Sequence, residues 1–241
     1  MKIISIIPAR YNSSRFPGKP LAAICGRPMI QYVYETVSGM SAISDVYVAT
    51  DDERIYSVVL SFGGKAIMTG KCACGSERVA QACKDIDCDI VLNIQGDEPM
   101  IKPEMIGDLI SAFNDPIVNM ATLKKLITSR EDINNPNIAK LITDVNNNAI
   151  YFSRSSIPYN RDGLDDVRFY KHIGVYGYKK DFLMKFVQLP RSPLECAEEL
   201  EQLRVLENGY SIRVVETQYQ SIGVDVPDHI ALVEREMRSV K

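Results

Sequence analysis

Residues 3–20, IISIIPARYNSSRFPGKP, decide the fold. The isoleucines at positions 3, 4, 6 and 7 form a short apolar run that is typical of a strand buried on both faces of a parallel sheet. The loop that follows carries the cations Arg10, Arg15 and Lys19, and its Pro17-Gly18 pair disfavours regular structure. Because open α/β sheets bind ligands where their strands end, we expect a polyphosphate at this loop; a solvated basic loop is the alternative.

Composition narrows the classes of function. The chain has 241 residues, of which 46% are hydrophobic and 24% charged, so it is globular and large enough for a buried core. The net charge of −3 provides no basic field for nucleic acid or anionic lipid. No apolar stretch approaches the roughly 20 residues that span a bilayer, and the apolar run before Pro8 is too short for a signal peptide. We therefore expect a cytoplasmic protein without nucleic-acid or membrane partners.

Strand and helix patterns alternate over the first half of the chain. The predicted strands cover residues 46–50, 66–68 and 90–94, and the predicted helices cover 28–37, 53–62 and 75–84. This alternation predicts an α/β fold with a doubly wound, mostly parallel sheet. After residue 115 we expect strands at 120–126, 138–144, 149–152 and 171–178, strand 211–215, and helices at 193–207 and 227–239. The second half therefore adds a small mixed or antiparallel extension.

Cysteines and acidic residues supply further candidate sites. Cys72, Cys74, Cys83 and Cys88 cluster without the spacing of paired zinc knuckles, so we expect reduced, mostly buried thiols, with structural zinc as the alternative. Asp97 follows the strand at 90–94, where a carboxylate beside a phosphate loop can hold Mg²⁺. Its alternative is an Asx-turn or helix cap, and a helix cap is also the simpler interpretation of Asp225.

Eight strings in one order resemble a known family from end to end. They are the loop 8–20, Ala49-Thr50-Asp51, Gly75-Ser76-Glu77-Arg78, Gln95-Gly96-Asp97-Glu98-Pro99, Tyr151-Phe152-Ser153-Arg154, His172 to Tyr178, Leu200 to Arg204, and Gly223-Val224-Asp225. Together they are similar to the CMP-Kdo synthetases (3-deoxy-manno-octulosonate cytidylyltransferases). Any one string is weak evidence, since looser forms of the first occur in other sugar nucleotidyltransferases. The resemblance implies one nucleotidyltransferase domain, 1–241, with a dimerisation and sugar-binding extension around 120–180.

The resemblance also implies the reaction CTP + Kdo → CMP-Kdo + pyrophosphate with Mg²⁺, in lipopolysaccharide or capsule synthesis. The catalytic residues that the resemblance implies are Arg10, Lys19 and Asp97, and the implied metal ligands are Asp97 and Asp225. Nucleotide binding would fall to Ala9, Arg10, Ser13, Arg15, Lys19 and Gly75. The family is commonly dimeric, so we expect a homodimer.

For the sugar acid, the resemblance implies contacts from Arg78, Gln95, Arg154, His172, Glu201 and Gln202. Arg78, Arg154 and His172 suit its carboxylate, and the other three suit its hydroxyls. A surface salt bridge is the alternative for Arg154, and a solvated helix face for Glu201. Glu201 and Gln202, adjacent on the predicted helix, would diverge by roughly 100°.

One string departs from the family. Cys72-Ala73-Cys74-Gly75-Ser76 stands where the family usually has His-x-Ser-Gly-Thr. The change leaves open a related substrate such as 8-amino-Kdo or a sialic-type nonulosonate. A catalytically inactive binding module is the alternative from another class, but Lys19 and Asp97 are both retained.

Overall fold

The protein, described here as a computed structural model, divides into two compact units. The structure describes residues 1–13 and 15–239. The first unit comprises Met1–Ile106 and Gln220–Lys241, and the second comprises Gly107–Tyr219. The division falls inside helix α4 (Pro103–Ser111). Within the described residues, no helix is both long and apolar enough to cross a membrane.

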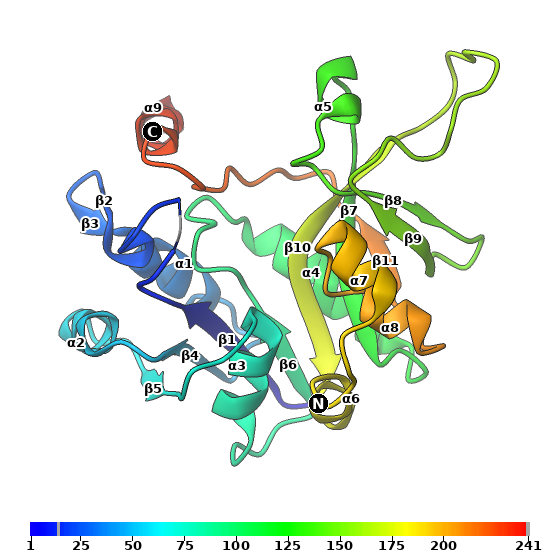
Figure 1. Cartoon of the computed structure of the whole chain (residues 1–241). Coiled ribbons are helices and arrows are strands. Elements are labelled where there is room, and N and C mark those ends of the chain that lie inside the picture. The colour runs from blue at the N-terminus through cyan, green and yellow to red at the C-terminus, as the bar shows by residue number, and fades with distance from the viewer. Residues whose placement is uncertain (14, 240–241) are drawn as a thin grey trace. The chain divides into compact units, whose positions relative to one another are not determined.

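The first unit is built on four parallel strands in the order β6-β1-β4-β5. Their bounds are β1 Ile3–Ala9, β4 Asp45–Thr50, β5 Ala66–Met68 and β6 Ile90–Asn93. Strand β1 lies between β4 and β6 (Figure 1), and its isoleucines are buried as expected. The parallel register brings the carboxyl ends of β1, β4 and β6 to one edge.

The α-helices that lie entirely within the described part of the first unit are α1 Met29–Ser38, α2 Glu53–Ser61, α3 Gly75–Cys83 and α9 His229–Ser239. In α1 the buried positions recur at helical spacing, which gives the helix one apolar face against the sheet. The Asp52 side chain caps α2 by accepting the Arg54 N–H at 3.0 Å. The turn η1 (Lys19–Leu21) and the hairpin of β2 (Ala23–Ile24) and β3 (Arg27–Pro28) precede α1.

The second unit is a mixed sheet, which confirms the expected extension. Strand β7 (Met120–Leu126) lies between β10 (Tyr170–Lys179), its antiparallel neighbour, and β11 (Arg213–Glu216), its parallel neighbour. The antiparallel pair β8 (Lys140–Thr143) and β9 (Ala149–Ser153) joins through β8 to β10. Its helices are η2 Ala112–Asn114, α5 Arg130–Asn134, α6 Lys180–Phe186, α7 Pro193–Glu198 and α8 Leu203–Glu207.

Lys140 is a fully buried cation at the start of β8. Its ammonium donates to the carbonyls of Asn135 at 2.9 Å, Ile138 at 2.7 Å and Arg154 at 2.5 Å. Burial lowers the pKa of Lys140 from its ordinary value. Its three donors satisfy three backbone acceptors, so Lys140 ties β8 to the preceding loop and to the end of β9.

The prediction of one helix over residues 193–207 is wrong, because the segment folds as α7 and α8 around a turn. Glu199 ends α7 in the left-handed region at φ 51°. The break lets the Glu207 carboxylate fold back onto the start of α7, where it accepts the Leu194 N–H at 3.1 Å. In one straight helix these two residues would stand about 20 Å apart along the axis. Glu201 and Gln202 therefore lie in the turn and not on a continuous helix.

Candidate active site

Two loops of the first unit leave its sheet at the same edge and carry several of the predicted nucleotide, sugar and metal contacts. Ala9 ends β1 opposite Thr50 of β4, and Asn93 ends β6 opposite Ile6 of β1. The loop after β1 begins at Arg10 and leads to Lys19, and the loop after β6 carries Gln95 and Asp97. The two loops therefore lie at the carboxyl ends of β1 and β6, which is the position expected from the sequence.

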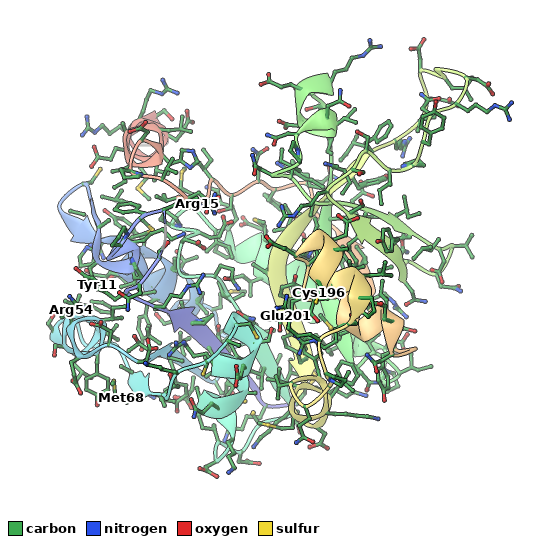
Figure 2. The ribbon with its side chains drawn as sticks, in the orientation of Figure 1. Tyr11, Arg15, Arg54, Met68, Cys196 and Glu201 are labelled. Atoms are coloured by element: carbon green, nitrogen blue, oxygen red, sulfur yellow. The ribbon has the colours of Figure 1, made fainter. Side chains whose placement is uncertain are left out.

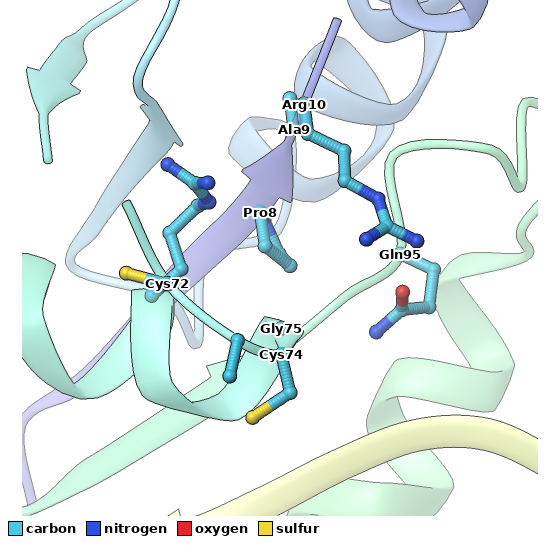
Figure 3. Close-up of a pocket in the computed structure, with 9 residues that line it drawn as sticks. Pro8, Ala9, Arg10, Cys72, Cys74, Gly75 and Gln95 are labelled. Carbon is cyan, nitrogen blue, oxygen red and sulfur yellow. The ribbon is translucent and has the colours of Figure 1, made fainter. Parts of the chain in front are cut away.

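A cavity of about 280 Å³ opens at this edge (Figure 3). The residues that line it come from the end of β1, the start of α3 and the loop after β6: Pro8, Ala9, Arg10, Cys72, Ala73, Cys74, Gly75, Arg78 and Gln95. In Figure 3, Arg10 and Gln95 lie on one side of the opening and Cys74 and Gly75 below it. Five of the predicted site residues therefore share one pocket: Ala9, Arg10, Gly75, Arg78 and Gln95.

Arg78 is a buried cation in the wall of this pocket. Its guanidinium lies 3.0 Å from the Asp51 carboxylate and donates to the Thr69 hydroxyl at 2.5 Å. Asp51 follows β4, so the interaction fixes α3 against the same sheet edge. Sequence reasoning assigned Arg78 to the sugar carboxylate and did not identify Asp51 as its partner.

Lys19 lies between two carboxylates. Its ammonium is 2.5 Å from Asp97 and 3.7 Å from Asp225, and only 13% of its side chain is exposed. Arg15 adds a second cation 3.0 Å from Asp225. Four predicted residues thus form one charged cluster within the first unit, although residues 19, 97 and 225 are far apart in the chain.

The two carboxylates of this cluster fit a divalent ion that substrate phosphates also coordinate. Mg²⁺ is usually held by one or two carboxylates together with phosphate oxygens, and Asp97 and Asp225 converge on the same cation. The described residues contain no group of three or more His, Cys, Asp or Glu side chains that could hold a metal ion. The alternative interpretation of Asp225 is a cap of the following helix. Helix α9 starts at His229, so the residue directly before it is Asp228 and not Asp225.

The loop between Arg10 and Lys19 is braced by a contact that the sequence did not suggest. The Tyr11 carbonyl accepts the N–H groups of Ser13 at 3.0 Å and Gly18 at 2.8 Å. The Arg54 guanidinium carbon lies 3.3 Å from the centroid of the Tyr11 ring, and Figure 2 shows the two side chains adjacent. Gly18 has φ 74°, and a Cβ there would lie 3.2 Å from the Tyr11 ring. The stack therefore holds the backbone just before Lys19.

His172 lies on β10 in the second unit, in contact with two aromatic rings. Its ring centroid is 5.1 Å from that of Phe152 and 5.4 Å from that of Tyr176, and its Nε2 lies 2.9 Å from the Thr122 hydroxyl. Burial lowers the pKa of His172 to about 3. The imidazole is therefore neutral at pH 7 in this structure, and its expected contact with the sugar carboxylate stays a prediction.

Gln202 is a buried amide in the turn between α7 and α8, with 3% of its surface exposed. Its Oε1 accepts the Tyr176 hydroxyl at 3.2 Å. Its Nε2 has no hydrogen-bond partner within the described part of the chain. A buried donor without a partner could bind a ligand oxygen, and the role of Gln202 toward a sugar stays a prediction.

The Arg154 guanidinium contacts backbone carbonyls in this structure. Its guanidinium donates to the carbonyls of Glu198 at 2.7 Å, Pro136 at 3.1 Å and Glu199 at 3.4 Å. Its own N–H donates to the Glu198 carboxylate at 2.8 Å. Arg154 therefore joins the end of β9 to the end of α7, and its role toward a sugar stays a prediction.

The six cysteines are present as thiols and not as disulfides, and the expectation that most are buried is wrong. Cys83 is buried, Cys25 and Cys196 are exposed, and Cys72, Cys74 and Cys88 are intermediate. Cys72 and Cys74 are partly exposed because they line the open pocket. Burial nevertheless raises the pKa of the Cys72 thiol.

Comparisons with known proteins agree on one family. A family model described as cytidylyltransferase matches residues 4–214. The 3-deoxy-manno-octulosonate cytidylyltransferase of Geobacter metallireducens is 49% identical over 95% of each chain. That of Syntrophotalea carbinolica is 48% identical over 100% of each.

Solved structures agree as well. A CMP:2-keto-3-deoxy-manno-octonic acid synthetase in complex with CTP superposes with a TM-score of 0.95 at 42% identity, covering 100% of both chains. A 4-diphosphocytidyl-2C-methyl-D-erythritol synthase from Anaerococcus prevotii has a TM-score of 0.65 at 16% identity, over 98% of this chain and 99% of that one. The latter likeness concerns the fold alone.

Proposed function

The chain belongs to the cytidylyltransferase family, and we propose that it transfers CMP from CTP to the anomeric hydroxyl of 3-deoxy-manno-octulosonate, releasing pyrophosphate. The observation that supports this most directly is the cluster of Lys19, Asp97 and Asp225 at the edge where β1 and β6 end. It supplies both a fixed cation and carboxylates, which phosphoryl transfer to a sugar hydroxyl requires. The full-length identity to enzymes of that name supports the choice of substrates.

The reaction needs positioning and charge, and no covalent nucleophile. The sugar hydroxyl oxygen bonds to the α-phosphorus of CTP, and the bond from that phosphorus to the oxygen bridging the α- and β-phosphates breaks. Pyrophosphate leaves with the electron pair of that bond, and the hydroxyl proton passes to solvent. Lys19 and Arg10 are placed to stabilise that charge, with Arg15 beside them. Ala9, Ser13 and Gly75 are the further nucleotide contacts, and Arg78, Gln95, Arg154, His172, Glu201 and Gln202 those of the sugar acid.

We take the divalent ion to be Mg²⁺, held by Asp97 and Asp225. When bound it would supply positive charge at the α-phosphate and acidify the sugar hydroxyl. The Lys19 ammonium, which neutralises these carboxylates in the present structure, is the group free to turn to a phosphate once they have another partner.

Assembly, location and pathway complete the proposal. We propose a homodimer in the cytoplasm that supplies an activated sugar for lipopolysaccharide or capsule synthesis. Light scattering at micromolar concentration tests the assembly, and the mass of a monomer would contradict it. Acids related to Kdo, such as 8-amino-Kdo or a sialic-type nonulosonate, are the alternative substrates, because Cys72 and Cys74 stand in the pocket wall.

Pyrophosphate release tests the function. Purified protein with Mg²⁺ is given each pair of CTP or UTP with Kdo, 8-amino-Kdo or N-acetylneuraminate. We expect turnover with CTP and Kdo well above every other pair, because a pocket that binds the cytosine amine rejects the analogue that lacks it. Equal turnover with UTP would overturn the nucleotide assignment, and a preference for another acid would replace Kdo. The Asp97→Asn variant serves as the inactive control.

A further inference from the structure

The Thr122 hydroxyl is the centre of a buried hydrogen-bonded group in the second unit. Thr122 lies on β7 and has no exposed surface. Its Oγ1 lies 2.8 Å from the carbonyl oxygen of Val175, 3.1 Å from that of Ile173 and 2.9 Å from His172 Nε2. Three polar groups from one stretch of β10 therefore meet at a single hydroxyl.

An irregularity in β10 brings these groups together. The β10–β7 register shifts between Ile173, which pairs with Leu123, and Tyr176, which pairs with Thr122. Two residues of β10 therefore have no counterpart on β7, and such a bulge disrupts the regular ladder of hydrogen bonds. The Thr122 hydroxyl lies within hydrogen-bond distance of two carbonyls of this irregular stretch and can donate its proton to either.

The number of protons decides the direction of each bond. A threonine hydroxyl has one proton, and carbonyl oxygens can only accept. If the hydroxyl donates to the bulge carbonyls, its remaining interaction must be as an acceptor, so His172 Nε2 carries a proton and donates to Oγ1. In a neutral imidazole only one nitrogen is protonated, and the low pKa of His172 keeps the ring neutral. Nδ1 then presents a lone pair.

The neighbouring rings hold the imidazole in this orientation. Phe152 meets it edge-on and Tyr176 lies tilted on it. We propose that Thr122 is a positioning residue, which fixes His172 as the Nε2–H tautomer so that Nδ1 accepts a hydrogen bond from a sugar hydroxyl. This inference rests on the proposed function, in which His172 contacts the sugar acid. It assigns His172 to a hydroxyl and leaves the carboxylate to other groups.

The tautomer can be measured without substrate. The chain has two histidines, so protein labelled with ¹⁵N at histidine gives two sets of ring signals, and a His172→Gln variant identifies which set belongs to His172. At pH 7 we expect the pattern of the Nε2–H tautomer for His172. The Nδ1–H pattern or that of an imidazolium would overturn the inference, whatever the activity of the enzyme.

Substitutions test whether Thr122 sets the tautomer. Thr122→Val removes the hydroxyl at nearly constant shape, and Thr122→Ser restores it. We expect Thr122→Val to lose the pure Nε2–H pattern. We also expect it to raise the KM for Kdo about tenfold, which is the scale of one hydrogen bond, and to leave the KM for CTP unchanged. Thr122→Ser should recover both properties. Thr217→Val removes another buried threonine hydroxyl of this unit and controls for a general loss of stability.

The outcomes separate this inference from the proposed function. An unchanged tautomer in Thr122→Val would overturn the role of Thr122. A changed tautomer with an unchanged KM for Kdo would overturn the link to the sugar. If His172→Gln itself leaves the kinetics with Kdo intact, the assignment of His172 as a sugar contact fails, while the tautomer result stands. Should Thr122→Val not fold, the measurement on the unmodified protein still decides the tautomer.

Discussion

The ammonium of Lys19 lies 2.5 Å from the carboxylate of Asp97, and the two residues are 78 positions apart in the sequence. The contact joins the loop after β1 to the loop after β6. Lys19 also reaches Asp225, so one cation balances two carboxylates that would otherwise repel each other. We infer that the first unit holds these charges ready for the phosphates and metal ion of a nucleotide.

Loss of the Lys19 side chain should impair catalysis far more than folding. We expect Lys19→Ala to lower kcat more than about a hundredfold, or roughly 2.7 kcal/mol, because an oriented cation is missing from the transition state. Steady-state kinetics and thermal unfolding measure the two effects. Lys84→Ala, at an exposed lysine after α3, should change neither. A large fall in Tm with modest kinetic loss would show that Lys19 is structural.

Asp97→Asn and Asp225→Asn should each abolish most turnover while the protein stays folded. Each change removes one negative charge from the pair that we assign to the metal ion. Higher Mg²⁺ concentrations should partly restore the activity of a variant that retains the other carboxylate. Full activity of Asp225→Asn with an unchanged Mg²⁺ dependence would remove that residue from the metal site.

Stability should depend on the ionisation of His172. Its pKa is about 3 in the folded protein and near 6.5 in the unfolded chain, so the unfolded state binds the proton first as the pH falls. The contribution of neutral His172 to the free energy of unfolding is complete above pH 6.5 and is lost progressively down to about pH 3. Between pH 7 and pH 5 we expect the unmodified protein to lose up to about 2 kcal/mol more unfolding free energy than His172→Gln. Parallel pH profiles in urea denaturation would contradict this.

The ion pair of Glu195 and Arg204 should be essential to the second unit. The guanidinium donates to both carboxylate oxygens, at 2.7 and 2.6 Å, and both side chains are buried. Glu195→Ala leaves the Arg204 charge buried without its carboxylate, so we expect a loss of about 3–5 kcal/mol in unfolding free energy. Glu131→Ala, at an exposed position of α5, should change it by less than about 0.5 kcal/mol. A loss below about 1 kcal/mol for Glu195→Ala is what an exposed salt bridge contributes, and it would mean that water reaches Arg204.

The features that the sequence predicts correctly are those that short local patterns of residues determine. The isoleucine run of β1 predicts a strand buried on both faces, and Pro17-Gly18 predicts the loop after it, so both the strand and the charged loop at its carboxyl end were predictable. The strings that resemble the family then identified Lys19, Asp97 and Asp225, which lie in one cluster.

The remaining features depend on partners that are distant in the sequence. The break at Glu199 is stabilised by Glu207 and Arg204, whereas the apolar spacing alone favoured one helix. The stack of Arg54 on Tyr11 joins residues 43 positions apart and has no sequence signal. The neutral state of His172 depends on burial, which residue type does not reveal.

The buried ammonium of Lys140 can report on the opening of the second unit. All three of its protons are bound to carbonyls and its side chain has no exposed surface, so an amine-reactive label can reach it only when β8 separates from its surroundings. Its labelling rate under native conditions would then follow the fraction of molecules that open locally. Mass spectrometry of that one peptide would time the fluctuations of this unit without any mutation.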